Sequence, residues 1–259
     1  MENRLLEIDN LSALYEDRII LQDINLDVRK GEVLCVVGES GSGKSTLIRA
    51  ICKDDRVKLA KGSISFNGEC ISNGSLSGKK KGNNLLGKKI GLIQQNPEGA
   101  FNPLRTFDVQ FKETLKSHGM KFDKDKLEHI FTTLGLKDTE KILKSHPYEM
   151  SGGMNQRIAI AASLILDPEL LLCDEITSAL DVSTAIAVTE ELLRLKKELD
   201  VTIVFVTHNL GIAANIGDRI AIMNNGQIVE DGKAGEVLRN PRHEYTKGLL
   251  RNVPKLKVV

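Results

Sequence analysis

Residues 38–45 read Gly-Glu-Ser-Gly-Ser-Gly-Lys-Ser, and they lie between the apolar run Glu32–Val37 and the helix-forming stretch Ser45–Cys52. They match the pattern GxxxxGK[ST]. Its glycines let the backbone curl so that successive N–H groups point at phosphate oxygens, and the helix that follows aims its positive end at the same anion. Lys44 supplies a charge for the β- and γ-phosphates, and the Ser45 hydroxyl is a ligand for Mg²⁺. The stretch predicts a nucleoside triphosphate site formed by Gly38, Glu39, Ser40, Gly41, Ser42, Gly43, Lys44, Ser45 and Thr46.

A second apolar strand, Leu170–Cys173, is followed by two carboxylates, Asp174 and Glu175. Taken alone, such a pair is usually a helix-capping feature, but beside a phosphate-binding loop it favours a metal and catalytic role. We therefore expect Asp174 to hold Mg²⁺, directly or through water, and Glu175 to polarise the attacking water. His208 follows the strand Thr202–Thr207. A lone histidine is usually structural, but its place at a parallel strand end puts His208 on the rim of the same site.

The rest of the chain alternates strands and helices around a helical block. Two hairpins are predicted, one turning at Asn67-Gly68 and one at Asn225-Gly226. Residues 105–166 have helical periodicity, and the polar stretch Ser72–Lys89 is predicted to be a loop or insertion. Its run Lys79–Lys81 is interpreted as a solvated charge run, with a membrane or partner contact as the alternative. A further strand is expected at Lys89–Gln94 and a further helix at Thr184–Leu199. One apolar helix face is expected, formed by Leu127, Ile130, Phe131 and Leu134. This order predicts an α/β fold with a parallel-sheet core and an inserted helical subdomain.

Composition limits the class of protein. The chain has 259 residues, 41% of them hydrophobic, and 36 basic against 35 acidic side chains give a net charge of +1. Such a balance supplies no field that favours nucleic acid. No apolar run reaches the ~18–20 residues of a membrane span, and the N-terminus carries no signal-peptide pattern, so we expect a cytoplasmic globular protein. The four cysteines form no CxxC pair and are interpreted as small buried hydrophobes in a reducing compartment, with a metal cluster as the alternative.

Residues 151–157 read Ser-Gly-Gly-Met-Asn-Gln-Arg, shortly before the strand that ends at Asp174. A small, glycine-rich helix start is an anion site in its own right, but in one isolated chain it would have no phosphate to bind. The segment resembles the signature of ATP-binding cassette (ABC) proteins. The resemblance implies that this segment binds the γ-phosphate of a nucleotide held by the other subunit of a dimer, through Ser151, Gly152, Gly153 and Met154.

Other motifs of that family follow in order along the chain. Tyr15 resembles the aromatic residue that stacks on adenine, and Gln95 resembles the Q-loop glutamine that contacts Mg²⁺ and the attacking water. Residues 178–181 resemble the D-loop, whose Asp181 crosses to the partner, and His208 resembles the switch histidine near the γ-phosphate. The resemblance implies a P-loop NTPase with a RecA-like core and an N-terminal antiparallel β region. Within a single domain, residues 1–95 and 167–259 would form the core and residues 96–166 the helical signature subdomain.

Further segments resemble the ATPases of peptide and nickel importers. They are Gln95-Asn96-Pro97, Phe101-Asn102-Pro103, the SGGM form of the signature, and the tail pattern Pro241…Tyr245-Thr246…Leu249-Leu250…Pro254. The resemblance implies an ATP-hydrolysing importer subunit for peptides or nickel and other metal chelates, at the cytoplasmic face of the membrane. Its partners would be two permease subunits, a second and usually different ATPase, and indirectly an extracytoplasmic substrate-binding protein; a homodimer stays open.

Departures from the family pattern are small. Ile176 stands where a proline is common, and Asn155 where a basic residue is frequent. No cysteine follows Cys173, which excludes the C-terminal iron–sulfur site of some peptide importers.

Rival classes are less consistent with these motifs. A GTPase would need an NKxD segment, and a nucleotide kinase would not explain the signature. A soluble ABC ATPase of DNA repair would carry a long coiled-coil insertion, and one of translation would carry two cassettes. A regulatory sensor would not need Glu175 and His208, and exporters often fuse the cassette to a membrane domain. The transported substrate cannot be read from this chain.

Overall fold

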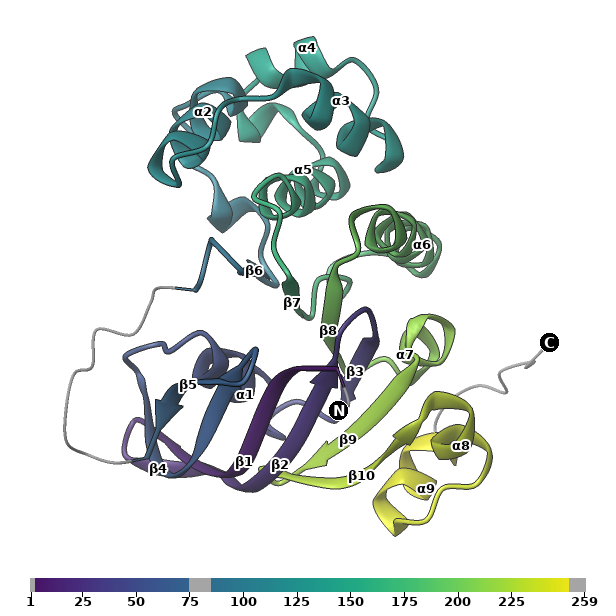
Figure 1. Cartoon of the computed structure of the whole chain (residues 1–259). Coiled ribbons are helices and arrows are strands. Elements are labelled where there is room, and N and C mark those ends of the chain that lie inside the picture. The colour runs from purple at the N-terminus through teal and green to yellow at the C-terminus, as the bar shows by residue number, and fades with distance from the viewer. Residues whose placement is uncertain (1–2, 75–84, 252–259) are drawn as a thin grey trace. The chain divides into compact units, whose positions relative to one another are not determined.

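The computed structural model describes residues 3–74 and 85–251, and it divides into two compact units (Figure 1). Unit 1 comprises Met1–Asn83 and Thr202–Val259, and unit 2 comprises Asn84–Val201. The elements of unit 1 are β1 (Arg4–Tyr15), β2 (Arg18–Arg29), β3 (Val33–Val37), α1 (Lys44–Ile51), β4 (Val57–Phe66), β5 (Glu69–Asn73), β8 (Thr202–Thr207), α7 (Leu210–Ile216), β9 (Arg219–Asn224), β10 (Gln227–Lys233), α8 (Ala234–Arg239) and α9 (Glu244–Arg251).

One sheet of unit 1 is antiparallel, with the strand order β2-β1-β4-β5. The turn between β4 and β5 is Asn67-Gly68, with φ of 51° and 77°, which is the geometry of a tight hairpin turn. A second two-residue turn, Glu16-Asp17, joins β1 to β2 and also has positive φ at both residues. The predicted N-terminal antiparallel region and its Asn67-Gly68 hairpin are confirmed.

The parallel part of unit 1 is built on β3, which pairs with β8 on one side and β9 on the other. Every residue of β3 and of β8 is buried. Central parallel strands are covered on both faces, and this explains their unbroken apolar sequences. β10 returns antiparallel to β9 through Asn225-Gly226, with φ of 46° and 78°, so the second predicted hairpin is also confirmed.

Unit 2 combines two parallel strands with helices. Its elements are β6 (Ile90–Ile93), η1 (Glu98–Ala100), α2 (Phe107–Ser117), α3 (Lys124–Thr133), α4 (Thr139–Lys144), η2 (Pro147–Glu149), α5 (Gly152–Leu164), β7 (Leu170–Asp174) and α6 (Val182–Leu199). The predicted apolar face of α3 is buried, and the Phe131 ring packs edge-on against Phe111 of α2 with ring centroids 5.9 Å apart. Arg157 of α5 forms a bidentate ion pair with Glu191 of α6. The predicted helical block is therefore confirmed.

Some sequence-based expectations need correction or stay open. Cys35 and Cys173 are buried as expected, but Cys52 is only half-buried and Cys70 is exposed. Cys70 lies on β5, a strand with no buried residue on either face, so its side chain is not covered. The run Lys79–Lys81 and Pro254 lie outside the described residues. The two compact units do not test the predicted division into a core and a helical subdomain, so that division stays a prediction.

Across the ranges 3–74 and 85–251, no helix is both long enough and apolar enough to cross a membrane.

Candidate nucleotide site

The loop that joins β3 to α1 is shaped by its glycines. A Cβ atom at Gly38 would lie 2.2 Å from the carbonyl oxygen of Met223 on β9, so no other residue fits there without moving that strand. Gly41 and Gly43 have φ of 83° and 105°, in the left-handed region that glycine adopts without strain. The phosphate-binding loop predicted from the sequence is thus present as a tight turn between a buried strand and a helix.

Two polar side chains of this loop are buried. Lys44 is only 3% exposed, and its Nζ donates hydrogen bonds to the carbonyl oxygens of Gly38 at 2.9 Å and Glu39 at 2.8 Å. The Ser42 hydroxyl oxygen has no hydrogen-bond partner among the described residues. A buried polar atom left without a partner is uncommon and marks a place for a ligand or water. A buried cation and a buried hydroxyl in one loop suit an anion with several acceptor oxygens, such as a phosphate chain.

The Asn225-Gly226 turn supports the phosphate-binding loop from the other side. The Gly226 N–H donates to the carbonyl oxygen of Ser42 at 2.9 Å, and its own carbonyl accepts from the Gln22 N–H at 2.9 Å. A Cβ at Gly226 would lie 1.9 Å from the Ile20 carbonyl oxygen. The sequence pattern predicts the turn correctly but carries no signal for its contact with the loop, because the two segments are far apart along the chain.

Tyr15 and His208 lie in the same unit as the loop. Tyr15 ends β1, and the guanidinium of Arg49 on α1 lies 5.1 Å from its ring centroid, which is a cation–π contact. Thr207 of β8 pairs with Val37 of β3 in parallel register. Gly38 and His208 therefore leave neighbouring strands at the same edge of the sheet. Unit 1 thus places the loop and His208 at one strand edge and Tyr15 beside helix α1, and their shared role in a nucleotide site stays a prediction.

Gln95, Asp174 and Glu175 meet at the strand edge of unit 2. Cys173 of β7 pairs with Ile93 of β6, so the residues that follow both strands leave at one edge. The Gln95 side-chain amide donates to the Ser178 hydroxyl at 3.2 Å. Glu175 has a φ of 48°, an uncommon left-handed conformation for a glutamate. Strained backbone of this kind is concentrated at functional sites, and the sequence gives no sign of it.

The signature segment begins helix α5. Ser151 is the N-cap residue, and its hydroxyl accepts a hydrogen bond from the Met154 N–H at 3.3 Å. A Cβ at Gly152 would meet no atom of the described chain within 4 Å, and one at Gly153 would meet none closer than 3.7 Å. The positive end of α5 is therefore open to an approaching anion. Asn155, which departs from the family pattern, is buried and donates to the Pro147 carbonyl at 2.9 Å.

Asp181 caps helix α6. Its carboxylate accepts from the Ser183 hydroxyl, the Thr184 hydroxyl at 2.6 Å and the Thr184 N–H at 3.0 Å. These hydrogen bonds, with that of Ser183 the largest cause, hold the pKa of Asp181 well below its usual value. The capping role is visible in this chain alone. The crossing role implied by the family resemblance needs a partner and stays a prediction.

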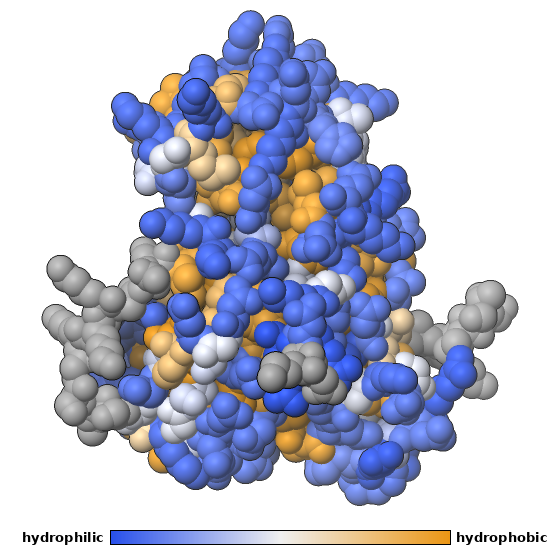
Figure 2. Space-filling model, in the orientation of Figure 1, coloured by the Kyte–Doolittle hydropathy of each residue, from blue (hydrophilic) through white to orange (hydrophobic). Residues whose placement is uncertain are grey.

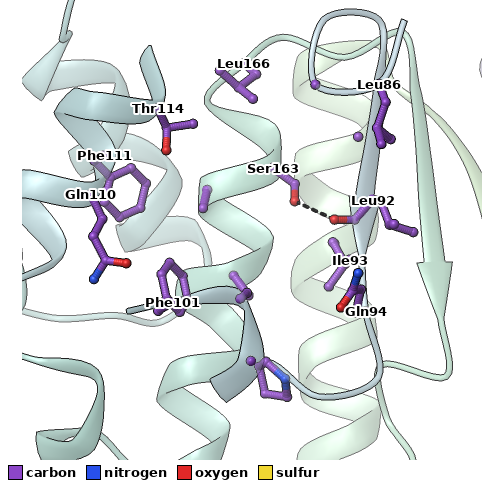
Figure 3. Close-up of a pocket in the computed structure, with 17 residues that line it drawn as sticks. Leu86, Leu92, Ile93, Gln94, Phe101, Gln110, Phe111, Thr114, Ser163 and Leu166 are labelled. Carbon is purple, nitrogen blue, oxygen red and sulfur yellow. Dashed lines mark hydrogen bonds between the residues drawn. The ribbon is translucent and has the colours of Figure 1, made fainter. Parts of the chain in front are cut away.

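Unit 2 also contains a cleft of about 390 Å³ beside β6 (Figure 3). Its lining includes Leu92 and Ile93 of β6, Phe101 from the stretch after η1, Phe111 of α2 and Ser163 of α5. The Ser163 hydroxyl donates to the Leu92 carbonyl at 3.3 Å and ties α5 to the strand. Figure 2 shows apolar residues reaching the surface between the hydrophilic ones where these helices lie. No pattern in the sequence predicts a cleft here.

The residues predicted to bind Mg²⁺ carry suitable oxygen ligands. Ser45, Gln95 and Asp174 offer hydroxyl, amide and carboxylate oxygens, which are the hard donors that Mg²⁺ prefers. Within the part of the chain that the structure describes, no three His, Cys, Asp or Glu side chains cluster as they would in an all-protein metal site. Each of these groups is of the kind that can hold a metal which arrives with a nucleotide and is bound by only one or two protein side chains.

The loop, its buried lysine and the parallel strands around β3 define the class of the protein, a P-loop nucleotide-binding protein. The family model for ABC transporters matches residues 21–178, which is more than half of the chain. The chain belongs to the ABC transporter family, and it is an ATP-binding and ATP-hydrolysing cassette.

Similar proteins have been named in bacteria. The Bacillus subtilis oligopeptide transport ATP-binding protein OppD is 38% identical over 98% of this chain and 73% of its own length. The Staphylococcus aureus metal-staphylopine import system ATP-binding protein CntD is 39% identical over 95% and 91%. Among solved structures, cbiO1 of the Clostridium perfringens ABC transporter complex cbiONQ is 27% identical with a TM-score of 0.78, covering 92% of each chain.

Proposed function

We propose that this chain is the ATP-hydrolysing subunit of an ABC importer, bound at the cytoplasmic face of a membrane through protein contacts. The observation that carries the proposal is the presence of two phosphate-type sites in one chain. The loop at Lys44 provides a buried cation and the Ser42 hydroxyl for one anion, and the open start of α5 at Gly152 has room for a second anion. A protein that bound one nucleotide and no partner would have no use for the second anion site.

Two cassettes would share each nucleotide. ATP held by the loop of one subunit would be contacted by Ser151, Gly152 and Gly153 of the other, so that ATP binding stabilises the closed dimer by mass action. The second subunit would be a different ATPase, with a homodimer as the other arrangement. Loss of the γ-phosphate on hydrolysis removes the bridge and reopens the dimer.

The catalytic residues would divide their work by chemistry. Lys44 neutralises charge on the phosphates, and bound Mg²⁺, held by Ser45, Asp174 and Gln95, would supply further positive charge. Glu175 accepts a proton from the attacking water, and such general-base catalysis contributes roughly 10²–10⁴-fold. His208 would contact the γ-phosphate at the rim of the site. Tyr15 would stack on the adenine ring, and the Arg49 guanidinium would hold the plane of the Tyr15 ring.

The cleft beside β6 supports a docking role for unit 2. The stretch from Gln95 to Leu104 supplies part of its lining, and Leu104 is 83% exposed although it is a large apolar residue. Exposed apolar side chains beside a cleft are typical of contact surfaces. We propose that one of the two permease subunits binds here, and that a substrate-binding protein delivers cargo to the permeases from outside the membrane.

The cargo would be peptides or chelates of nickel and other metals. This range comes from the family resemblance of the sequence, and two of the similar proteins are named for oligopeptide transport and for metal-staphylopine import. A cassette that hydrolyses ATP without coupling to transport is the alternative, and no observation favours it.

Affinity purification of the tagged, full-length chain from gently solubilised membranes tests the proposal. We expect two permeases and a second ATPase in the eluate, and ATP hydrolysis that rises several-fold when substrate and its binding protein are added. An eluate that contains this chain alone, with full hydrolysis in the soluble fraction, would contradict the importer assignment.

A further inference from the structure

The C-terminal segment of unit 1 has no role in the nucleotide site described above, although its sequence pattern is one of the features that distinguish this chain. It consists of α9 and the residues just before it, drawn in yellow in Figure 1. Glu230 of β10 anchors it: one carboxylate oxygen accepts from the Arg242 N–H at 2.8 Å and the other from the His243 N–H at 3.0 Å. The segment is thereby fixed to the strand that follows the Asn225-Gly226 turn.

The start of α9 is fixed by a second set of contacts. His243 Nδ1 accepts a hydrogen bond from the Tyr245 N–H at 3.1 Å. Thr246, the next residue, is fully buried. The backbone on both sides of Tyr245 is therefore held in place, and the direction of its side chain follows from that.

The Tyr245 side chain reaches the phosphate-binding loop. Its hydroxyl oxygen accepts a hydrogen bond from the Glu39 N–H at 3.2 Å, across 206 positions of sequence. Glu39 N–H and Gly38 C=O belong to one peptide group, and that carbonyl accepts from Lys44 Nζ at 2.9 Å. The ammonium, the peptide and the phenol thus form one chain of hydrogen bonds. Hydrogen bonds in such chains polarise and strengthen one another.

We propose that Tyr245 is a positioning residue of the nucleotide site, whose hydroxyl holds the Gly38–Glu39 peptide in the orientation that the loop needs to receive a triphosphate. The inference rests on the proposed role of this loop. It makes the C-terminal segment part of the ATP site, beyond the motifs between Tyr15 and His208. Burial raises the pKa of the Tyr245 hydroxyl, so it stays neutral at physiological pH and adds no negative charge next to the phosphates.

A single atom separates the test variant from the wild type. Tyr245→Phe removes the hydroxyl and keeps the ring, and Tyr148→Phe makes the same change at an exposed tyrosine of unit 2. In the full-length protein we expect Tyr245→Phe to weaken binding of ATP with Mg²⁺ about three- to tenfold, the effect of one lost hydrogen bond. Tyr148→Phe is expected to leave the affinity unchanged within twofold. Isothermal titration calorimetry measures both.

Hydrogen exchange followed by mass spectrometry separates a positioning role from a structural one. We expect Tyr245→Phe to speed exchange of the peptide that contains Glu39 severalfold without nucleotide, and to leave that of residues 244–251 unchanged. Faster exchange confined to residues 244–251, with wild-type affinity for ATP, would overturn the inference. If Tyr245→Phe does not fold, His243→Ala withdraws the acceptor of the Tyr245 N–H instead. Exchange of residues 244–251 then rises as well, so the decision rests on the other two readings: faster exchange of the peptide that contains Glu39 with weaker ATP binding supports the inference, and wild-type values of both overturn it.

Lys44→Ala distinguishes failure of this inference from failure of the site itself. We expect it to abolish measurable ATP binding. If it does so while Tyr245→Phe binds like the wild type, the nucleotide site stands and the role of Tyr245 is refuted. Wild-type ATP binding by Lys44→Ala would overturn the site, and the role of Tyr245 with it.

Discussion

The molecule contains two glycine-rich turns that each precede a helix, and they differ in what requires the glycine. At Gly38, a Cβ would collide with the Met223 carbonyl at 2.2 Å, so the chain itself excludes any larger residue. At Gly152, a Cβ would meet no atom of the described chain within 4 Å, and the residue is not in the left-handed conformation. Glycine at a helix start is not the most stable choice. The fold explains the first glycine, whereas no contact of the described chain requires the second, as expected if an anion from a partner approaches it as proposed.

The supports of the two turns differ in the same way. The phosphate-binding loop is held by hydrogen bonds from Gly226 and to Tyr245, and it contains the buried Lys44. The signature turn is exposed at Ser151 and Gly152, and the hydrogen bond of its Ser151 hydroxyl is a local one, accepted from the Met154 N–H. A braced loop suits a site that binds nucleotide in the separate subunit. An open helix start suits a surface that completes a site on a partner.

The largest effect is expected at Glu175, which lies in unit 2 with the signature turn, whereas the phosphate-binding loop lies in unit 1. Glu175→Gln keeps the size of the side chain and removes its capacity to take a proton, so ATP hydrolysis in the assembled complex should fall by about 10²–10⁴. ATP affinity should stay within about threefold, because the braced loop in unit 1 is untouched. Steady-state phosphate release and equilibrium ATP binding are the measurements. Glu190→Gln, an exposed position on α6, is the matched control and should change neither.

Hydrolysis within threefold of the wild type in Glu175→Gln would remove Glu175 from the role of general base. A residue of unit 2 other than Glu175 would then have to accept the proton of the attacking water.

A smaller effect, on stability, is expected at Gly38. Gly38→Ala forces a methyl group against the Met223 carbonyl, and such overpacking costs about 1–3 kcal/mol of unfolding free energy. For a domain of this size that corresponds to a fall in melting temperature of roughly 2–12 °C. Differential scanning calorimetry of the nucleotide-free protein measures it. Gly235→Ala, where a Cβ meets nothing within 4 Å, is the control and should not lower the melting temperature.

An unchanged melting temperature in Gly38→Ala would mean that β9 gives way easily. The distinction between a glycine required by the chain and one required by a partner would then be lost.

Local patterns predicted much of this structure. The loop at residues 38–45, the turns at Asn67-Gly68 and Asn225-Gly226, and the apolar face of α3 all follow from residues close together in sequence, and all are confirmed. The contacts that support the loop could not be predicted in this way. Gly226 and Tyr245 reach it from distant parts of the chain, and no short-range pattern encodes such a distance.

Two other features depended on tertiary structure. The left-handed backbone of Glu175 is imposed by the turn that follows β7, and a glutamate in a sequence gives no indication of it. Cys70 was expected to be buried because cysteine usually is, but neither face of its strand β5 is covered, and Cys70 is exposed.

Gly152→Ala tests most directly whether the signature turn acts on a nucleotide held by another subunit. In the isolated, full-length chain we expect ATP affinity within twofold of the wild type, and a melting temperature unchanged or up to about 4 °C higher, since alanine favours the helix. In the assembled complex, ATP hydrolysis should fall by about 10²–10³, as expected when donors to a transition-state phosphate are displaced. Wild-type hydrolysis in the complex, or lost ATP binding by the isolated chain, would contradict a site completed by the partner.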